Sequence, residues 1–188
     1  MARANEKSAF TSGQGMLVVI DPAVEDYDFL KTGVRPGAQV IVLNKEQEAI
    51  AQITAQLKET PHPRQTCPFN SVHLVAPSSP GILHFSSGDF SLQTLDPYVE
   101  QLQTWFTGDG SAASPAAVEP QLLLYGRRVG AGQSGTEFMD TLSWLTGAKV
   151  IAAKNGDRWP KLEGEQGEQI ALAFPSSIRQ SYQGTFSV

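Results

Sequence analysis

The stretch MLVVIDPAVEDYDFLKTGVRPGAQVIVL, residues 16–43, indicates the fold class of this chain. It contains two apolar runs, Met16–Ile20 and Ala38–Leu43, separated by a more polar segment. A continuous apolar run of this length is typical of a strand that is buried on both faces. Between the two runs, VEDYDFL predicts a short helix that ends at Gly33. Strands joined through a helix are usually parallel, so this stretch predicts the start of a parallel sheet covered by helices.

Three further strands are predicted downstream, and they are Ser71–Val75, Gln121–Tyr125 and Lys149–Ala153. Three amphipathic segments are predicted as helices because their apolar residues recur at helical spacing. The apolar faces are Ile50, Ile53 and Leu57; Leu95, Val99, Leu102 and Phe106; and Phe138, Leu142 and Leu145. The stretch ILHFSSGDFS predicts a small hairpin whose arms flank Ser87-Gly88. Residues 155–188 have a mixed strand and turn character and are assigned no element.

The predicted fold class is therefore α/β, with a mostly parallel sheet of about five to six strands, helices on both faces and a hairpin after the third strand. Residues 16–188 are expected to form one domain, since a single core typically serves roughly 100 to 200 residues. Residues 1–15 are expected to form a flexible N-terminal arm. They lack the apolar run of a secretion signal, so we expect no N-terminal signal peptide.

Composition excludes several classes of protein. The chain is 40% hydrophobic, which rules out disorder throughout, and no apolar run is long enough to span a bilayer. Its net charge of −5 argues against binding nucleic acid. One cysteine and three histidines give no zinc motif, so we expect neither a metal site nor a cofactor.

The loops at the carboxyl ends of the strands are where parallel sheets carry their functional sites. The turn after the third strand, Ala-Pro-Ser-Ser-Pro-Gly at residues 76–81, contains Ser78 and Ser79. A serine nucleophile needs a base within hydrogen-bond distance, and His84 is near in the sequence. No G-x-S-x-G motif is present. The two serines fit either a structural turn, which we favour, or a serine-dependent hydrolase that uses His84.

The turn after the fourth strand, YGRRVGAGQSG at residues 125–135, carries Arg127 and Arg128. Glycines and cations ahead of a helix are typical of phosphate-binding loops, but the spacing matches neither G-x-G-x-x-G nor the Walker motif. Two interpretations remain. The arginines contact an anion or a partner's carboxylate, or they form ion pairs with acidic side chains at the edge of the sheet.

Six blocks of the sequence resemble the domain-of-unknown-function-4347 family in their order, spacing and wording. They are MLVVIDPAVEDYDFL, PGAQVIVLN, EAIAQITAQL, VHLVAPSSPGILHFSSGDFSLQTL, QLLLYGRRVGAGQSGTEFMDTLSWLTGAKVIAA and SYQGTF. The resemblance implies a caspase-like three-layer sandwich. It also implies a place near the N-terminus of a large bacterial surface or secreted protein. An extracellular or cell-surface location is expected on this ground alone.

The resemblance further implies a His–Cys dyad, which this chain lacks. Where the family reads S-H-G-x-P-G, this chain has Pro77 at the histidine position and keeps Gly81. Where the family reads Y-G-C-D, this chain keeps Tyr125 and Gly126 and has Arg127 at the cysteine position. Proline does not titrate, and an arginine with a pKa above about 12 is neither nucleophile nor base at neutral pH.

We therefore expect a non-catalytic, caspase-like module that binds a protein partner or helps to assemble a larger surface structure. The former cleft would be the contact, formed by Pro77, Ser78, Ser79, Gly81, Tyr125, Gly126, Arg127 and Arg128. The alternative is a structural subunit or spacer of a self-assembling filament or coat. A serine-dependent hydrolase is the third and least favoured interpretation.

Overall fold

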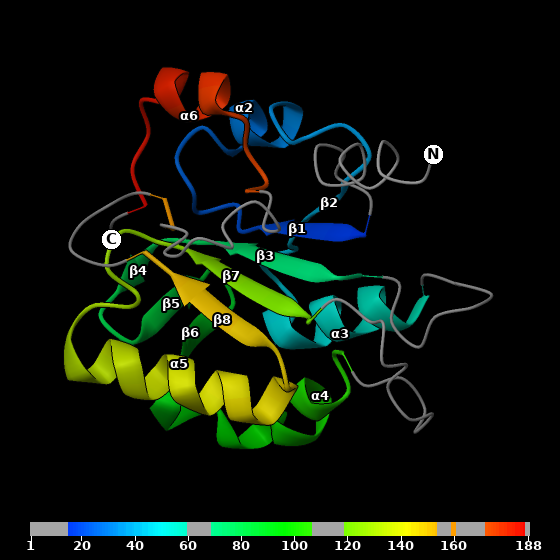
Figure 1. Ribbon diagram of the computed structural model, residues 1–188, viewed down its shortest axis with the longest axis vertical. Helices are drawn as coiled ribbons and strands as arrows, with labels where there is room; N and C mark the ends of the chain where they lie inside the picture. Colours follow the sequence, from blue (N-terminus) through cyan, green and yellow to red (C-terminus); the bar gives the residue numbers. More distant parts are fainter. Residues whose placement is uncertain (1–14, 60–68, 107–118, 154–158, 161–171, 187–188) are drawn as a thin grey trace, which may run out of the picture.

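Five parallel strands form the central sheet, in the spatial order β2-β1-β3-β7-β8. The computed structural model describes residues 15–59, 69–106, 119–153, 159–160 and 172–186 (Figure 1). The strands are β1 (Met16–Ile20), β2 (Gln39–Val42), β3 (Ser71–Val75), β7 (Gln121–Tyr125) and β8 (Lys149–Ala152). All five predicted strands are confirmed, and their carboxyl ends meet at one edge of the sheet.

Helices cover both faces of this sheet, so the three-layer α/β arrangement is confirmed (Figure 1). One layer contains α3 (Ala49–Glu59), α4 (Val99–Gln103) and α5 (Gly132–Thr146), and the other contains α2 (Tyr27–Thr32) and α6 (Ser176–Ser181). The side chains of β1 alternate between the two cores: Leu17 and Val19 pack in the first, and Met16, Val18 and Ile20 in the second. The sheet therefore stabilises two hydrophobic cores at once.

The predicted apolar faces of α3 and α5 are buried as expected. The helix predicted to carry Leu95, Val99, Leu102 and Phe106 on one face is shorter in the structure than expected. Two 3₁₀ turns, Leu92–Thr94 and Asp96–Tyr98, precede the short helix α4. Pro97 lies at the start of the second turn and has no backbone N–H to donate, so a continuous helix cannot run through this position.

A second, antiparallel sheet of three strands follows β3, where the sequence predicted a two-stranded hairpin. The strands are β4 (Ser78–Ser79), β5 (Ile82–Phe85) and β6 (Gly88–Ser91). The turn between β5 and β6 is Ser86-Ser87, one residue earlier than predicted. The carboxylate of Asp21, only 1% exposed, accepts hydrogen bonds from Ser86 N at 2.8 Å and from Ser86 Oγ at 2.6 Å. The small sheet is thereby tied to the end of β1.

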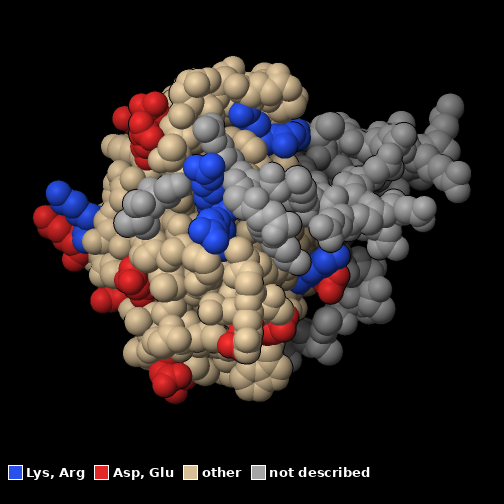
Figure 2. All heavy atoms as spheres, turned by 90° about the vertical axis from the view of Figure 1, so that its left-hand side faces the viewer, with Lys and Arg blue, Asp and Glu red and all other residues tan. Residues whose placement is uncertain are grey.

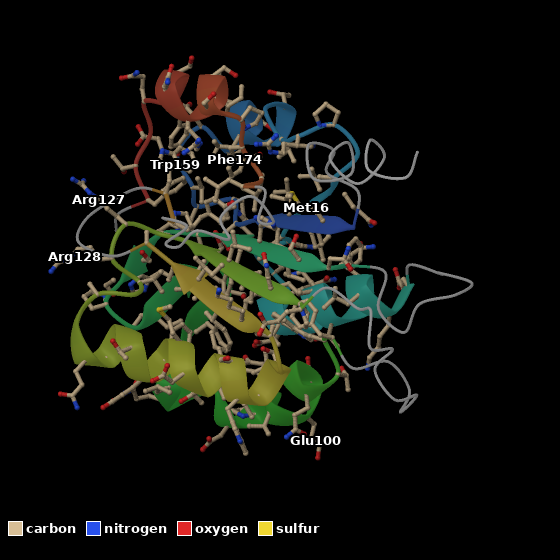
Figure 3. The ribbon with its side chains drawn as sticks, viewed as in Figure 1. Met16, Glu100, Arg127, Arg128, Trp159 and Phe174 are labelled. Atoms are coloured by element: carbon tan, nitrogen blue, oxygen red, sulfur yellow. The ribbon has the colours of Figure 1, made fainter. Side chains whose placement is uncertain are left out.

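The segment 172–186, to which the sequence assigned no element, completes the second core. Its aromatic side chains Phe174, Tyr182 and Phe186 are buried and pack with Trp159 against Tyr125 of β7. Figure 3 shows Trp159 and Phe174 on the side of the sheet that carries α2 and α6. The expected N-terminal arm lies outside the described residues except for Gly15. Within the described parts of the chain, no helix combines the length and apolarity needed to cross a membrane.

A buried chain of hydrogen bonds connects this segment to the sheet. Ala173 N donates to the hydroxyl of Tyr125 at 3.0 Å, and that hydroxyl lies 2.9 Å from His73 Nδ1. His73 Nε2 lies 3.0 Å from Ser71 Oγ, so both ring nitrogens of this buried imidazole have a hydrogen-bond partner. Burial lowers the pKa of His73 from 6.5 to about 3, so the imidazole is neutral in the folded protein.

We expect acid to destabilise the fold through His73. Between pH 6.5 and about pH 3, the unfolded chain binds a proton at this imidazole and the folded chain does not. The free energy of unfolding should therefore fall by up to about 1.4 kcal/mol per pH unit as the pH is lowered through this window. Urea denaturation at stepped pH should show a shallower slope for His73→Gln, which keeps hydrogen-bonding groups but does not titrate. Equal slopes for the two proteins would contradict the assignment.

Candidate functional site

The turns after β3 and β7 lie against each other at the carboxyl edge of the sheet. Ala76 N donates to Tyr125 O at 3.3 Å, which continues the strand pairing into the turns. A Cβ atom on Gly126 would lie 2.3 Å from Ser78 Oγ and 2.5 Å from Ser78 Cβ. Gly126 is thus required by the close approach of the two turns. The turn that carries Pro77 and the turn that carries Arg127 are therefore in direct contact.

Most of the predicted cleft residues are buried. Those shielded from solvent are Pro77, Ser78, Gly81, Tyr125 and Gly126. Ser79 is half-buried, and Arg127 and Arg128 are exposed. Tyr125 belongs to the buried chain with His73, where burial raises the pKa of its hydroxyl above the usual range. The side chains that a partner in solution can reach are therefore the two arginines and the edge of Ser79.

Arg127 and Arg128 project outward from the carboxyl edge of the sheet, away from both cores (Figure 3). Figure 2 faces the same side of the molecule and shows basic side chains near the middle of this surface, with acidic side chains around its margin. An arginine guanidinium presents a planar set of donors that fits a carboxylate in a bidentate manner. This surface can therefore attract carboxylates although the whole chain has a net charge of −5.

The two serines of the turn after β3 differ in their surroundings. Ser78 Oγ is buried against Gly126 and has no hydrogen-bond partner within the described residues. Ser79 Oγ lies 2.7 Å from His84 Nε2, and His84 Nδ1 lies 2.6 Å from Asp89 Oδ1. The sequence predicted the pairing of a serine with His84 as one alternative, and the structure selects Ser79. Asp89 was missed because the predicted hairpin turn placed it out of register with His84.

Other side chains with metal-binding or nucleophilic chemistry form no further site among the described residues. Cys67 and the acidic stretch at residues 163–168 lie outside the described residues. Glu25, in the acidic cluster after β1, accepts a hydrogen bond from Thr185 N at 3.0 Å and so has a structural partner. Among the residues that the structure describes, no group of three or more His, Cys, Asp or Glu side chains is placed to hold a metal ion.

The fold and its carboxyl edge define a three-layer α/β domain with an all-parallel central sheet and a small antiparallel sheet attached to it. Comparison of the sequence with known families identifies one of them: the family described as Domain of unknown function (DUF4347) matches residues 17–186. The chain belongs to this family, and the resemblance noted from the sequence is confirmed. No curated protein and no solved structure matches the chain.

Replacing Gly126 with alanine should destabilise the protein by about 1–3 kcal/mol, because the added methyl group overlaps Ser78. The double variant Ser78→Gly, Gly126→Ala removes the opposing side chain and should recover part of this loss. Thermal unfolding of the four proteins of the double-mutant cycle measures the coupling between the two positions. Strictly additive losses would show that the two turns are not in contact.

Proposed function

We propose that this domain is a caspase-like module that is non-catalytic at the family's histidine and cysteine positions and that binds a protein partner through Arg127 and Arg128. The observation that carries the proposal is the exposure of both guanidinium groups above two turns that are otherwise buried. The positions of the family's histidine and cysteine hold Pro77 and Arg127, neither of which can act as base or nucleophile at neutral pH. This edge of the sheet presents the positive charge of two arginines on a backbone that is held in place.

Close packing and hydrogen bonds hold the backbone on both sides of Arg127 and Arg128. Gly126 is fixed against Ser78, and Ser78 N donates to Phe186 O at 3.0 Å. After the arginines, the chain is held again by Gly130 N, which donates to Ala153 O at 3.1 Å. A backbone held in this way loses little conformational freedom when a partner binds, which favours affinity. The partner that fits is a protein segment rich in Asp and Glu.

The family resemblance supports a role in a bacterial surface or secreted assembly. In that setting, the domain would hold a neighbouring protein or another part of its own assembly. Self-association is the alternative, and the exposure of Trp144 on α5 favours it, since its side chain is 79% exposed. Large exposed aromatic side chains are common where proteins contact one another.

The test is affinity capture from the source organism, with the purified domain as bait. The variant Arg127→Ala, Arg128→Ala should lose the partner or bind it at least about tenfold more weakly, because arginine is among the residues that carry most binding energy. The matched control is Lys58→Ala, Lys149→Ala. It removes the same charge from two exposed positions, one in the last turn of α3 and one at the start of β8, and should bind as the unmodified domain does.

Equal recovery with the arginine variant would show that the carboxyl edge is not the contact. Recovery of the domain alone, in a concentration-dependent oligomer, would favour self-association instead. Binding should also weaken as salt is raised, because exposed charges are screened over about 8 Å at physiological ionic strength.

A further inference from the structure

Three polar side chains on the outer face of the small sheet form a connected chain. Ser79 comes from β4, His84 from β5 and Asp89 from β6. Neighbouring residues in a strand point to opposite faces, so the pair Leu83 and Phe90 is buried while His84 and Asp89, directly opposite each other, face outward. Ser79 lies diagonally across from His84 on the same face. The register of the three strands thus brings the groups together.

The order of atoms is the one that activates a serine. Asp89 Oδ1 lies 2.6 Å from His84 Nδ1, so the carboxylate accepts the hydrogen of this nitrogen. The neutral ring then has its lone pair on Nε2, which lies 2.7 Å from Ser79 Oγ and accepts the hydroxyl hydrogen. A serine whose proton points at an oriented imidazole meets the geometric requirement for nucleophilic catalysis.

The hydrogen-bonded side chains of Ser79, His84 and Asp89 are accessible to solvent, and the backbone around them is held in place. The side chain of His84 is 24% exposed and that of Asp89 is 55% exposed, so a small molecule can reach this face. His84 N donates to Pro77 O at 2.8 Å, and Gly81 N donates to Val129 O at 2.9 Å, which fixes the turn between Ser79 and His84. The opposite face of the small sheet is anchored in the core by Leu83 and Phe90.

The same turn lies against the beginning of α5. A Cβ atom on Gly81 would lie 2.7 Å from Ser134 O, in the first turn of this helix. No side chain caps the N-terminus of α5. The close approach of Gly81 holds the turn against α5, and the Ser79–His84–Asp89 chain alone defines the site.

We propose that Ser79 is a nucleophile activated by His84 and positioned through Asp89, and that it takes activated esters of small acyl groups as substrates. Ser79 Oγ attacks the ester carbonyl carbon while its proton passes to His84 Nε2. The bond between the carbonyl carbon and the leaving oxygen breaks, and the leaving alcohol takes the proton from His84. Water then attacks the acylated Ser79 by the same route and releases the acid. This activity is independent of partner binding at Arg127 and Arg128.

The test uses a fluorophosphonate probe, with a reference serine hydrolase labelled in parallel. Ser79 Oγ attacks phosphorus, fluoride leaves, and the proton passes to His84, so one stable adduct forms. Mass spectrometry should place this adduct on Ser79. The rate of labelling should fall about 10²–10⁴-fold in His84→Gln, which removes the base. Asp89→Asn should reduce the rate less, because an exposed carboxylate orients the ring with weaker charge stabilisation.

Matched control variants show whether labelling depends on the pairing of Ser79 with His84. Ser134→Ala removes an exposed serine beside Gly81, and Lys58→Ala, Lys149→Ala changes two exposed residues outside the small sheet, so both proteins should be labelled at the normal rate. Unchanged thermal unfolding of His84→Gln would exclude loss of fold as the cause. Absence of labelling on Ser79, or an equal rate in His84→Gln, would overturn the proposal.

Discussion

The burial of β1 on both faces is the constraint from which the architecture follows. A strand with five apolar residues in succession has no polar face to turn toward water, so it needs a hydrophobic layer on each side. Helices α3 and α5 supply one layer. Helix α2 and the segment 172–186 supply the other. Parallel pairing then brings the turns after β1, β3 and β7 to one edge, where the residues of both proposed sites lie.

That edge contains a buried region and, beside it, a region exposed to solvent. The turns after β3 and β7 fill the space between them with Pro77, Ser78 and Gly126, which are buried, and leave Arg127 exposed. The antiparallel sheet beside them stands out from this packing and exposes His84 and Asp89. A buried carboxylate, Asp21, ties this sheet to the end of β1 by accepting hydrogen bonds from Ser86.

Much of the fold could be predicted from the sequence, because the strands and the helices α3 and α5 carry regular apolar patterns. Helix α6 could not, since none of its residues is buried and its anchors, Phe174 and Tyr182, flank it. At the site, a one-residue error in the hairpin turn was enough to hide Asp89. With the turn at Ser87-Gly88, His84 would face Ser91, whereas the turn at Ser86-Ser87 pairs it with Asp89. The hydrogen bonds from Ser86 to Asp21 fix this choice, and they join residues far apart in the sequence.

The order of the strands also has a consequence for how the chain folds. The central strands β1, β3 and β7 come from residues 16–20, 71–75 and 121–125, and each pairing closes a loop of roughly fifty residues. Such long-range pairings form slowly. The second core is complete only when Phe186 packs and its carbonyl accepts the hydrogen of Ser78 N. During synthesis on the ribosome, one face of the sheet is therefore covered only by α2 until almost the whole described chain has emerged, and in this interval its apolar strands are open to aggregation and to chaperones.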